Sequence, residues 1–151
     1  MTAEDVDGVV VFGGTNDYIL SVPIGQRFDT NTATFFGGLN TLMTGLLSMY
    51  QGKPIIFCTP IRYSVDKNVV PDGLTKLTGS NASQANTLQV ISEAIMERCR
   101  YYGIQYVDLF DNGGFSPWDL TSYYDGLHPS ENGHKQLAGI IQHALELRFN
   151  Y

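Results

Sequence analysis

The sequence predicts an α/β fold built on a parallel sheet, and three observations lead to this prediction. Short apolar runs at residues 7–12, 54–59 and 105–109 have the length and composition of buried strands. Between these runs, apolar residues recur at every third or fourth position, as they do on one face of an amphipathic helix. Glycine or proline bounds each run. The order strand, helix, strand, helix, strand favours parallel pairing through helical crossovers.

Length and composition limit the class of protein. The chain has 151 residues and is 43% hydrophobic, which suits one globular domain, so residues 1–151 are interpreted as a single domain. The chain has only nine lysines and arginines, and its net charge is −6. This charge argues against nucleic acid or an anionic membrane as partner. No apolar run reaches the roughly 18 residues of a membrane helix, and the polar first residues do not form a signal peptide. We expect a soluble chain whose location is unknown.

The first apolar run, Asp-Gly-Val-Val-Val-Phe at residues 7–12, ends abruptly at two glycines. Its β-branched composition predicts a strand that is buried on both faces. Open α/β sheets bind ligands at the C-terminal ends of their strands, and Asn16 and Asp17 follow this end closely. Both residues also have an ordinary interpretation, because Asn and Asp tolerate turns and cap helices.

A helix is predicted over residues 35–50. Its apolar face is formed by Phe35, Leu39, Leu42, Met43, Leu46, Leu47 and Tyr50. Asn31 or Thr32 can cap its start, and glycine and proline follow its end. The helix contains Gly37, Gly38 and Gly45. Each of these glycines weakens the helix by up to about 1 kcal/mol, so we expect close packing at all three.

The next segment, residues 62–83, is a long polar loop that is either functional or a plain connection. A helix with Leu88, Ile91, Ile95, Cys99 and Tyr102 on one face follows, and it ends near Gly103 before the strand at residues 105–109. Cys58 and Cys99 lie in apolar segments, which favours buried free thiols over a disulfide.

A second loop, residues 111–124, carries the four aromatic residues Phe115, Trp118, Tyr123 and Tyr124. These side chains either stack on a sugar or acyl group or pack the loop itself. The last helix is predicted to start near Ser130. Its histidines, His134 and His143, are interpreted as residues of the helix face rather than metal ligands. No phosphate-binding glycine loop and no convincing metal-ligand cluster occurs in the sequence.

Between this loop and this helix lies Asp125-Gly126-Leu127-His128-Pro129. In a tight turn, a carboxylate three residues before an imidazole can reach its ring N–H and determine which nitrogen remains free as a base. Pro129 disfavours a helical conformation at His128, so the imidazole precedes the last helix on an extended link. The alternative is that Asp125 is only a turn residue.

Taken together, the motifs resemble the SGNH hydrolases, also called GDSL-type esterases and lipases. The resemblance rests on a strand ending in Gly14-Thr15-Asn16-Asp17, a strand ending in Thr59-Pro60, and the Asp125 to Pro129 motif followed by Gly133-His134. It implies a flavodoxin-like three-layer α/β/α sandwich, in which a Ser-His-Asp triad cleaves esters through an acyl-enzyme. No metal or other cofactor is implied.

The resemblance also implies roles for four residues. His128 is the general base and then the general acid, and Asp125 orients its ring and stabilises the imidazolium. Asn16 donates a side-chain N–H to the oxyanion, and Gly14 allows the tight backbone turn beside it. One such oxyanion donor is typically worth about 3 kcal/mol of transition-state stabilisation.

One part of the family pattern is not found in the sequence. The family's nucleophile lies in a Gly-Asp-Ser turn after its first strand, before the block that contains Asn16. No serine here lies in such a turn, and Ser21, Ser64 and Ser116 are not assigned this role. We therefore expect the N-terminal strands to be absent from this chain, which would correspond to roughly the C-terminal two thirds of a family domain. Three alternatives remain: a piece of a working esterase, a hydrolase completed by a separate polypeptide, and a non-catalytic binding or structural module.

Substrate and assembly are the final expectations. The polar and aromatic loops favour an ester of a carbohydrate, such as an acetylated sugar, or a short acyl ester over a long acyl chain. The family's sheet order, 2-1-3-4-5, implies that loss of the first two strands makes residues 9–12 an edge strand. Such an edge is a template for pairing, so we expect a homodimer or larger assembly that covers Val10 and Phe12.

Overall fold

The chain folds around a parallel sheet of three strands in the order β1-β2-β3. A computed structural model describes residues 3–63 and 88–149. The strands are β1 (Val9–Phe12), β2 (Ile55–Cys58) and β3 (Gln105–Val107). Both pairings are parallel, with Val9 opposite Ile55 and Ile56 opposite Gln105. The predicted α/β class and parallel sheet are confirmed.

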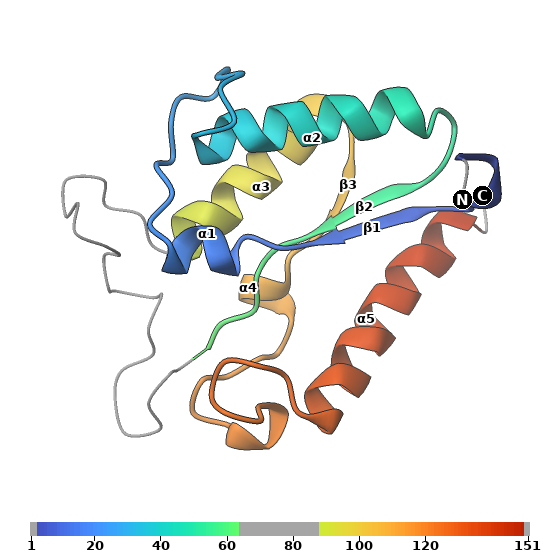
Figure 1. Ribbon diagram of the computed structural model, residues 1–151. Helices are drawn as coiled ribbons and strands as arrows, with labels where there is room; N and C mark the ends of the chain where they lie inside the picture. Colours follow the sequence, from blue (N-terminus) through green and yellow to red (C-terminus); the bar gives the residue numbers. More distant parts are fainter. Residues whose placement is uncertain (1–2, 64–87, 150–151) are drawn as a thin grey trace.

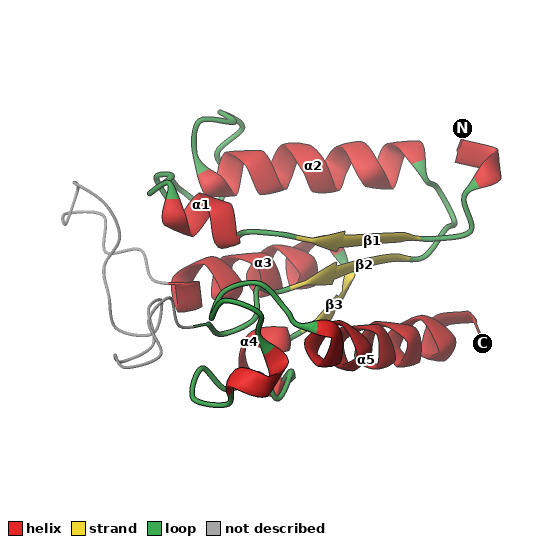
Figure 2. Cartoon of the chain, turned by 60° about the horizontal axis from the view of Figure 1, so that its bottom comes forward, coloured by secondary structure: helices red, strands yellow, loops and turns green. Residues whose placement is uncertain are grey.

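Helices cover both faces of this sheet. The long helices are α2 (Phe35–Met49), α3 (Leu88–Tyr102) and α5 (Glu131–Phe149). Helices α2 and α3 pack against each other on one face of the sheet, and α5 lies on the other (Figures 1 and 2). The predicted α/β/α layering is therefore confirmed. None of the helices in the described ranges is long and apolar enough to cross a membrane.

Four short helical segments complete the described chain. They are η1 (Ala3–Asp5), α1 (Thr15–Ile19), α4 (Leu109–Asn112) and η3 (Leu120–Ser122). The sequence predicted neither α1 nor α4. The strand predicted at residues 105–109 ends at Val107, because the next residue, Asp108, caps α4: its Oδ1 accepts a hydrogen bond from the backbone N of Asp111 at 3.0 Å.

Burial differs between the central strand and the first strand. All four residues of β2 are buried, as expected for an interior strand. In β1, Val10 is 39% exposed and Phe12 is 45% exposed, and within the described sheet β1 pairs with β2 on one side. The prediction that this strand is buried on both faces is therefore wrong. The expectation that it forms an edge of the sheet is confirmed.

The residue that caps α2 differs from the prediction, although the helix begins at Phe35 as expected. Thr34, rather than Asn31 or Thr32, is the N-cap, and its side-chain oxygen accepts a hydrogen bond from the backbone N of Gly37 at 3.2 Å. The Oδ1 of Asn31 instead accepts a bond from the backbone N of Ala33 at 3.0 Å. Asn31 therefore stabilises the turn before the helix rather than its first turn.

Close packing at the glycines of α2 is found at one position of three. A Cβ added to Gly37 would overlap the carbonyl oxygen of Asn31. At Gly38 and Gly45, an added Cβ would meet no atom within 4 Å, so the prediction is wrong for these two glycines. Gly37 is the residue at which the incoming loop crosses the first turn of the helix.

Buried residues elsewhere follow the predicted pattern. Cys58 and Cys99 are both buried and free, as predicted.

The last helix begins at Glu131, and the Oγ of Ser130 accepts a hydrogen bond from the backbone N of Gly133 at 3.2 Å. The long polar loop predicted at residues 62–83 lies almost entirely outside the described residues.

Candidate active site

The first wall of the candidate site is the turn between β1 and α1. Gly14 has a φ of 107°, a left-handed conformation that favours glycine. A Cβ at this position would also lie 2.9 Å from Ile91 and 3.2 Å from Pro60. The chain therefore turns tightly against α3 and the end of β2, and this turn puts Asn16 into α1 directly beyond the strand.

The second wall is the turn that carries His128. The backbone N of Tyr124 donates a hydrogen bond to the carbonyl oxygen of His128 at 2.8 Å, and Tyr123 pairs with Pro129 in an antiparallel bridge. Two residues further out, the backbone N of Ser130 donates to the carbonyl oxygen of Ser122 at 3.0 Å. Because bonds close the turn on both sides of His128, its backbone is fixed at the start of α5.

Within this turn, Asp125 and His128 form a close pair. The Oδ2 of Asp125 lies 2.6 Å from Nδ1 of His128, and its Oδ1 accepts hydrogen bonds from the backbone N of His128 at 2.7 Å and of Leu127 at 3.0 Å. These bonds, first that from the His128 backbone and then that from its ring, hold the pKa of Asp125 well below its usual value. An ionised carboxylate only accepts hydrogen bonds, so Nδ1 carries the proton and Nε2 is the basic nitrogen of the neutral ring.

Asn16 and His128 face the same cavity, which has a volume of about 520 Å³. The other residues that line it are Phe12, Gly13, Gly14, Thr15, Asp17, Ile61, Tyr63, Leu127 and Pro129. Asp125 is outside this lining and contacts His128 at Nδ1, while Asn16 and His128 share the cavity. Among the described residues that line the cavity there is no serine.

The turn with His128 is tied to the end of β2 through Arg62. The hydroxyl of Tyr123 donates a hydrogen bond to the backbone carbonyl oxygen of Arg62. The guanidinium of Arg62 donates to the carbonyl oxygen of Phe110 at 2.7 Å and pairs with the carboxylate of Asp111. Arg62 therefore connects the helix α4 with the segment after β2 and the turn with His128, and the last two line the cavity.

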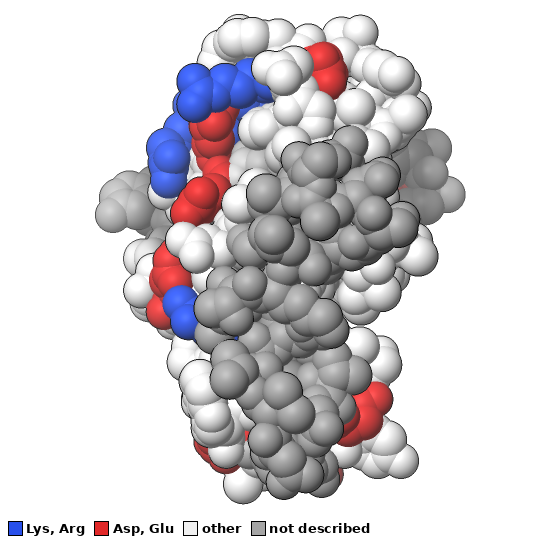
Figure 3. All heavy atoms as spheres, turned by 90° about the vertical axis from the view of Figure 1, so that its left-hand side faces the viewer, with Lys and Arg blue, Asp and Glu red and all other residues white. Residues whose placement is uncertain are grey.

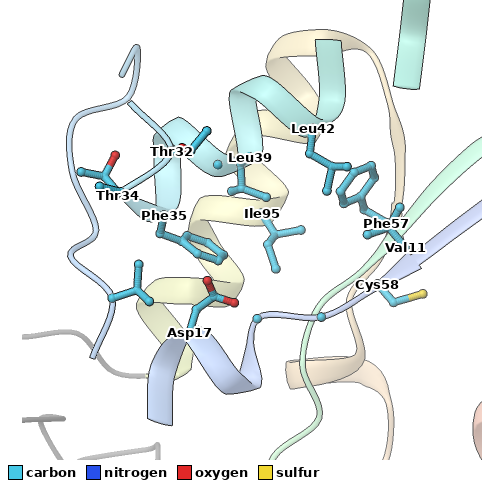
Figure 4. Close-up of a pocket in the computed structure, with 15 residues that line it drawn as sticks. Val11, Asp17, Thr32, Thr34, Phe35, Leu39, Leu42, Phe57, Cys58 and Ile95 are labelled. Atoms are coloured by element: carbon cyan, nitrogen blue, oxygen red, sulfur yellow. The ribbon is translucent and has the colours of Figure 1, made fainter. Parts of the chain in front are cut away.

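A second cavity, also of about 520 Å³, adjoins the first (Figure 4). It lies between α2 and β1, and it shares Gly13, Gly14 and Asp17 with the first cavity. Burial raises the pKa of Asp17, although its backbone hydrogen bond opposes this effect. Cys58 also lines the second cavity, but burial raises the pKa of its thiol to about 11, so it remains a weakly nucleophilic thiol at neutral pH.

The aromatic residues of the loop before Asp125 divide into two pairs. Phe115 and Tyr123 are buried and pack edge to face with ring centroids 6.0 Å apart. Trp118 and Tyr124 are 68% and 82% exposed. The packing interpretation therefore holds for the first pair, whereas the second pair remains accessible from solvent.

The remaining candidate residues lie away from the cavity. His134 and His143 are exposed on α5, and the described part of the chain contains no cluster of three or more residues able to hold a metal ion. Ser21 and Ser116 do not line the cavity, and Ser64 is outside the described residues. On the face shown in Figure 3, the visible basic side chains lie along the left-hand edge beside acidic ones, and further acidic side chains lie elsewhere on this face.

Sequence reasoning missed the apolar residues of the cavity. Ile61 and Tyr63 follow β2 just as Asn16 follows β1, and Phe12 is the last residue of its strand. Their positions at the C-terminal ends of parallel strands are the signal that could have identified them.

Comparison with known proteins agrees with this architecture. Residues 1–136 match the profile of the GDSL-like Lipase/Acylhydrolase family. A crystal structure of a protein from Lactobacillus plantarum is 30% identical, with a TM-score of 0.80, over 95% of this chain and 68% of that one. Two structures with lower identity share the fold. A possible lipase from Chitinophaga pinensis is 21% identical with a TM-score of 0.73, over 93% of this chain and 72% of that one.

The other is a lipase/acylhydrolase from Enterococcus faecalis, 20% identical with a TM-score of 0.63, over 96% of this chain and 64% of that one. The chain thus spans about two thirds of the length of these structures. No match was found among curated proteins.

Proposed function

Because the chain belongs to the GDSL-like lipase/acylhydrolase family, we propose that it forms the base and oxyanion half of an ester hydrolase that works through an acyl-enzyme. The observation that carries this proposal is the meeting of Asn16 and the Asp125–His128 pair at one cavity. Asn16 lies near the start of the chain, and the Asp125–His128 pair lies near its end. A chance arrangement would not require an amide and an imidazole held by a carboxylate to meet at one concave surface.

In the proposed mechanism, Nε2 of His128 removes the proton from the attacking hydroxyl. The imidazolium that forms is stabilised by Asp125, whose low pKa keeps it ionised throughout the reaction. His128 then donates the proton to the leaving alcohol, and in the second half-reaction it activates water in the same way. No metal ion is needed for these steps.

Asn16 is proposed as the donor to the oxyanion. Within the described residues its side-chain amide makes no hydrogen bond of its own, so the N–H is available to a substrate oxygen. A donor of this kind acts on charge that develops in the transition state, and its removal typically lowers kcat by about 10²- to 10³-fold. Gly14 contributes by allowing the tight turn that presents Asn16.

The nucleophile is proposed to come from a Gly-Asp-Ser turn outside these 151 residues. Two observations support this: the sequence has no such turn, and the cavity has no serine among its described lining residues. The segment that supplies it is either joined to this chain or a separate polypeptide. The chain alone is then expected to have little or no esterase activity, since loss of the nucleophile removes most of the acceleration by a triad.

The proposed substrates are small esters, with an acetylated carbohydrate or a short acyl ester as the candidate classes. Trp118 and Tyr124 are exposed near the turn with Asp125 and offer aromatic faces on which a sugar ring can stack. No polyanionic partner is proposed, because the net charge of the chain is −6.

A covalent probe and a rate measurement test this function. The chain and a longer protein with an upstream Gly-Asp-Ser segment are treated with a fluorophosphonate, and hydrolysis of p-nitrophenyl acetate is followed. We expect labelling and turnover only in the longer protein. In that protein, His128→Ala and Asn16→Ala should each lower kcat by at least about 10²-fold. His134→Ala is the matched control, because that histidine is exposed on α5, and it should leave the rate unchanged.

Turnover by the 151-residue chain at ordinary enzyme rates, lost in His128→Ala, would mean that a serine within the chain serves as nucleophile. A second candidate function, a non-catalytic binding module of the same fold, is favoured by the absence of serine among the described cavity residues. It predicts that no Gly-Asp-Ser segment is encoded in frame shortly upstream, and that no longer protein is labelled.

A further inference from the structure

We infer that Tyr123 and Arg62 form a bridge that positions the turn with His128 against the end of β2, and thereby sets the place of the general base relative to Asn16. Neither residue belongs to the described lining of the candidate site, so both act through other residues and are positioning residues rather than catalytic ones. The inference deepens the proposed function and rests on it, because it concerns the same histidine.

Packing does little to hold the catalytic pair. The side chain of His128 is 69% exposed and that of Asp125 is 43% exposed. The hydrogen bonds around them join residues of one segment, 121–130. Besides the bonds described above, the Oγ of Ser130 donates to the carbonyl oxygen of Thr121 at 2.6 Å. These bonds fix the shape of the turn, but its place in the molecule requires contacts with other segments.

The hydroxyl of Tyr123 supplies such a contact near the start of this segment. It donates a hydrogen bond to the carbonyl oxygen of Arg62, which lies between Ile61 and Tyr63, two residues of the cavity lining. The ring of Tyr123 is buried and packs edge to face on Phe115, so the hydroxyl points in a fixed direction. Burial raises the pKa of this phenol far above its ordinary value, so the hydroxyl stays a donor at neutral pH.

Arg62 is itself anchored to α4. Its Nε donates to the carbonyl oxygen of Phe110 at 2.7 Å, and its guanidinium pairs with Asp111 and lies 4.5 Å from the centre of the Phe110 ring. The backbone N of Phe110 donates to Oγ1 of Thr59 at 2.9 Å, and Thr59 is fully buried just after β2. The helix α4 lies beside the segment that follows β2 in Figures 1 and 2. A line of contacts thus runs from the end of β2 through α4 and Arg62 to the turn with His128.

The consequence for the reaction is geometric. Asn16 follows β1, which pairs with β2, whereas His128 lies well beyond β3 in the chain. The bridge links the turn with His128 to β2, and so to the strand pair beside Asn16. A general base must lie about 2.6–3.2 Å from the hydroxyl that it deprotonates, and a displacement of about 1 Å can cost about 10²-fold in rate. Loss of the bridge should therefore lower the rate while the reacting groups remain unchanged.

NMR of the purified chain tests the bridge without requiring catalysis. Tyr123→Phe keeps the buried ring and removes only the hydroxyl. We expect the amide signals of residues 121–130 to shift together and to broaden through motion on the microsecond-to-millisecond timescale. The methyl signals of Ile61 should shift as well. The signal of the Nδ1 proton of His128 should persist, because Asp125 holds that proton from within the turn.

Tyr102→Phe is the matched control. The hydroxyl of Tyr102 also donates a hydrogen bond, to Oδ1 of Asn40 at 3.1 Å, but this bond joins α3 to α2 outside the described linings of both cavities. The variant measures what the loss of a tyrosine hydroxyl does to the fold in general. It should leave the signals of residues 121–130 and of Ile61 in place.

A second variant tests the anchor of the bridge. Arg62→Met removes the guanidinium but keeps the carbonyl oxygen that accepts from Tyr123, and it should move the same signals in the same direction. The double variant should shift them no further than the more affected single variant does, because both changes break one line of contacts. Additive shifts would mean that the two residues act independently, and the bridge would then be wrong.

A longer protein with a Gly-Asp-Ser segment separates positioning from a purely structural role. In that protein Tyr123→Phe should lower kcat about tenfold, counted per active site titrated in the burst phase, with KM within about twofold of the wild type. The shape of the pH profile of kcat should be retained, since the base and its carboxylate are unchanged. Tyr102→Phe should leave kcat unchanged.

The outcomes separate this inference from the proposed function. Unmoved signals at residues 121–130 in Tyr123→Phe, equal shifts in Tyr102→Phe, or an unchanged kcat in Tyr123→Phe would each overturn the bridge. Loss of the Nδ1 proton signal of His128 would overturn it too, because the turn itself would then have unfolded. If no longer protein is labelled by a fluorophosphonate, the proposed function fails, whereas the NMR result for the bridge stands.

Discussion

The carboxylate of Asp125 binds His128 twice, through the ring Nδ1 at 2.6 Å and through the backbone N at 2.7 Å. The second contact means that the residue which orients the imidazole also holds the backbone that carries it. The turn and the catalytic pair are thus one hydrogen-bonded unit, and the charge on Asp125 is required by both.

The first prediction concerns Asp125→Asn. Because the folded pKa of Asp125 lies below its ordinary value of 3.8, the ionised form contributes stability above that value, and the contribution is lost as pH falls through the folded pKa. The variant should therefore have a lower Tm than the wild type at pH 7, and the difference should shrink as pH falls below about 4. Thermal unfolding followed by circular dichroism measures this. Since the backbone bond is the larger cause, most of the pH dependence should persist in a His128→Ala background; its disappearance there would contradict this account.

Asp17→Asn should behave in the opposite way. Burial raises the folded pKa of Asp17, so the wild type gains stability from its protonated form at low pH and loses that gain as pH rises through the folded pKa. The variant cannot ionise and should have a higher Tm than the wild type at pH 7. The advantage should vanish below about pH 4, where both side chains are neutral. A Tm below that of the wild type at pH 7 would show that the charge of Asp17 has a stabilising partner.

Two glycines of α2 provide a matched pair of substitutions. In Gly37→Ala the new Cβ overlaps the backbone oxygen of Asn31, which cannot move away as a side chain can. The free energy of unfolding should therefore fall by about 1–3 kcal/mol. In Gly45→Ala the new Cβ meets open space, and the better helix propensity should stabilise the chain by up to about 1 kcal/mol. Urea unfolding of both variants checks the signs. Equal effects at the two positions would contradict the predicted contact with Asn31.

The exposed edge of β1 leads to a prediction about assembly. Val10 and Phe12 are partly exposed on a strand that has a backbone partner on one side within the described sheet. We expect two copies to pair through this edge, and Val10→Lys should shift the dimer to monomer. Leu20→Lys is the control, because Leu20 is 75% exposed but lies outside the strand. Light scattering that finds a monodisperse monomer of the wild type at micromolar concentration would exclude the pairing.

The sequence was informative where many residues repeat one pattern. The helix predicted at residues 35–50 is found at Phe35–Met49, and the predicted face of α3 is buried at Leu88, Ile91, Ile95 and Cys99. The helices α1 and α4, with five and four residues, are too short to show a period and were not predicted. The start of α4 depends on a local bond, which the backbone N of Asp111 donates to the side chain of Asp108.

The candidate site could be predicted in part for a similar reason. The proximity of Asp125 and His128 depends on one turn, so their spacing in sequence was sufficient. Asn16 could be placed at the same edge only because parallel strands end together. The second cavity could not be foreseen, since it is formed by side chains of two strands, three helices and the segment before α2, whose relative positions no local pattern specifies.

The parallel sheet also has a consequence for the order of folding. Each strand pairs with one that lies nearly fifty residues away, as for Ile56 and Gln105, so the loop-closure entropy must be overcome before any strand contact forms. The helices can form from local contacts. The strand ends beside Asn16 and the turn with His128 come together only when both strand pairings are complete. We expect folding to be limited by sheet formation, with the cavity among the last features to appear.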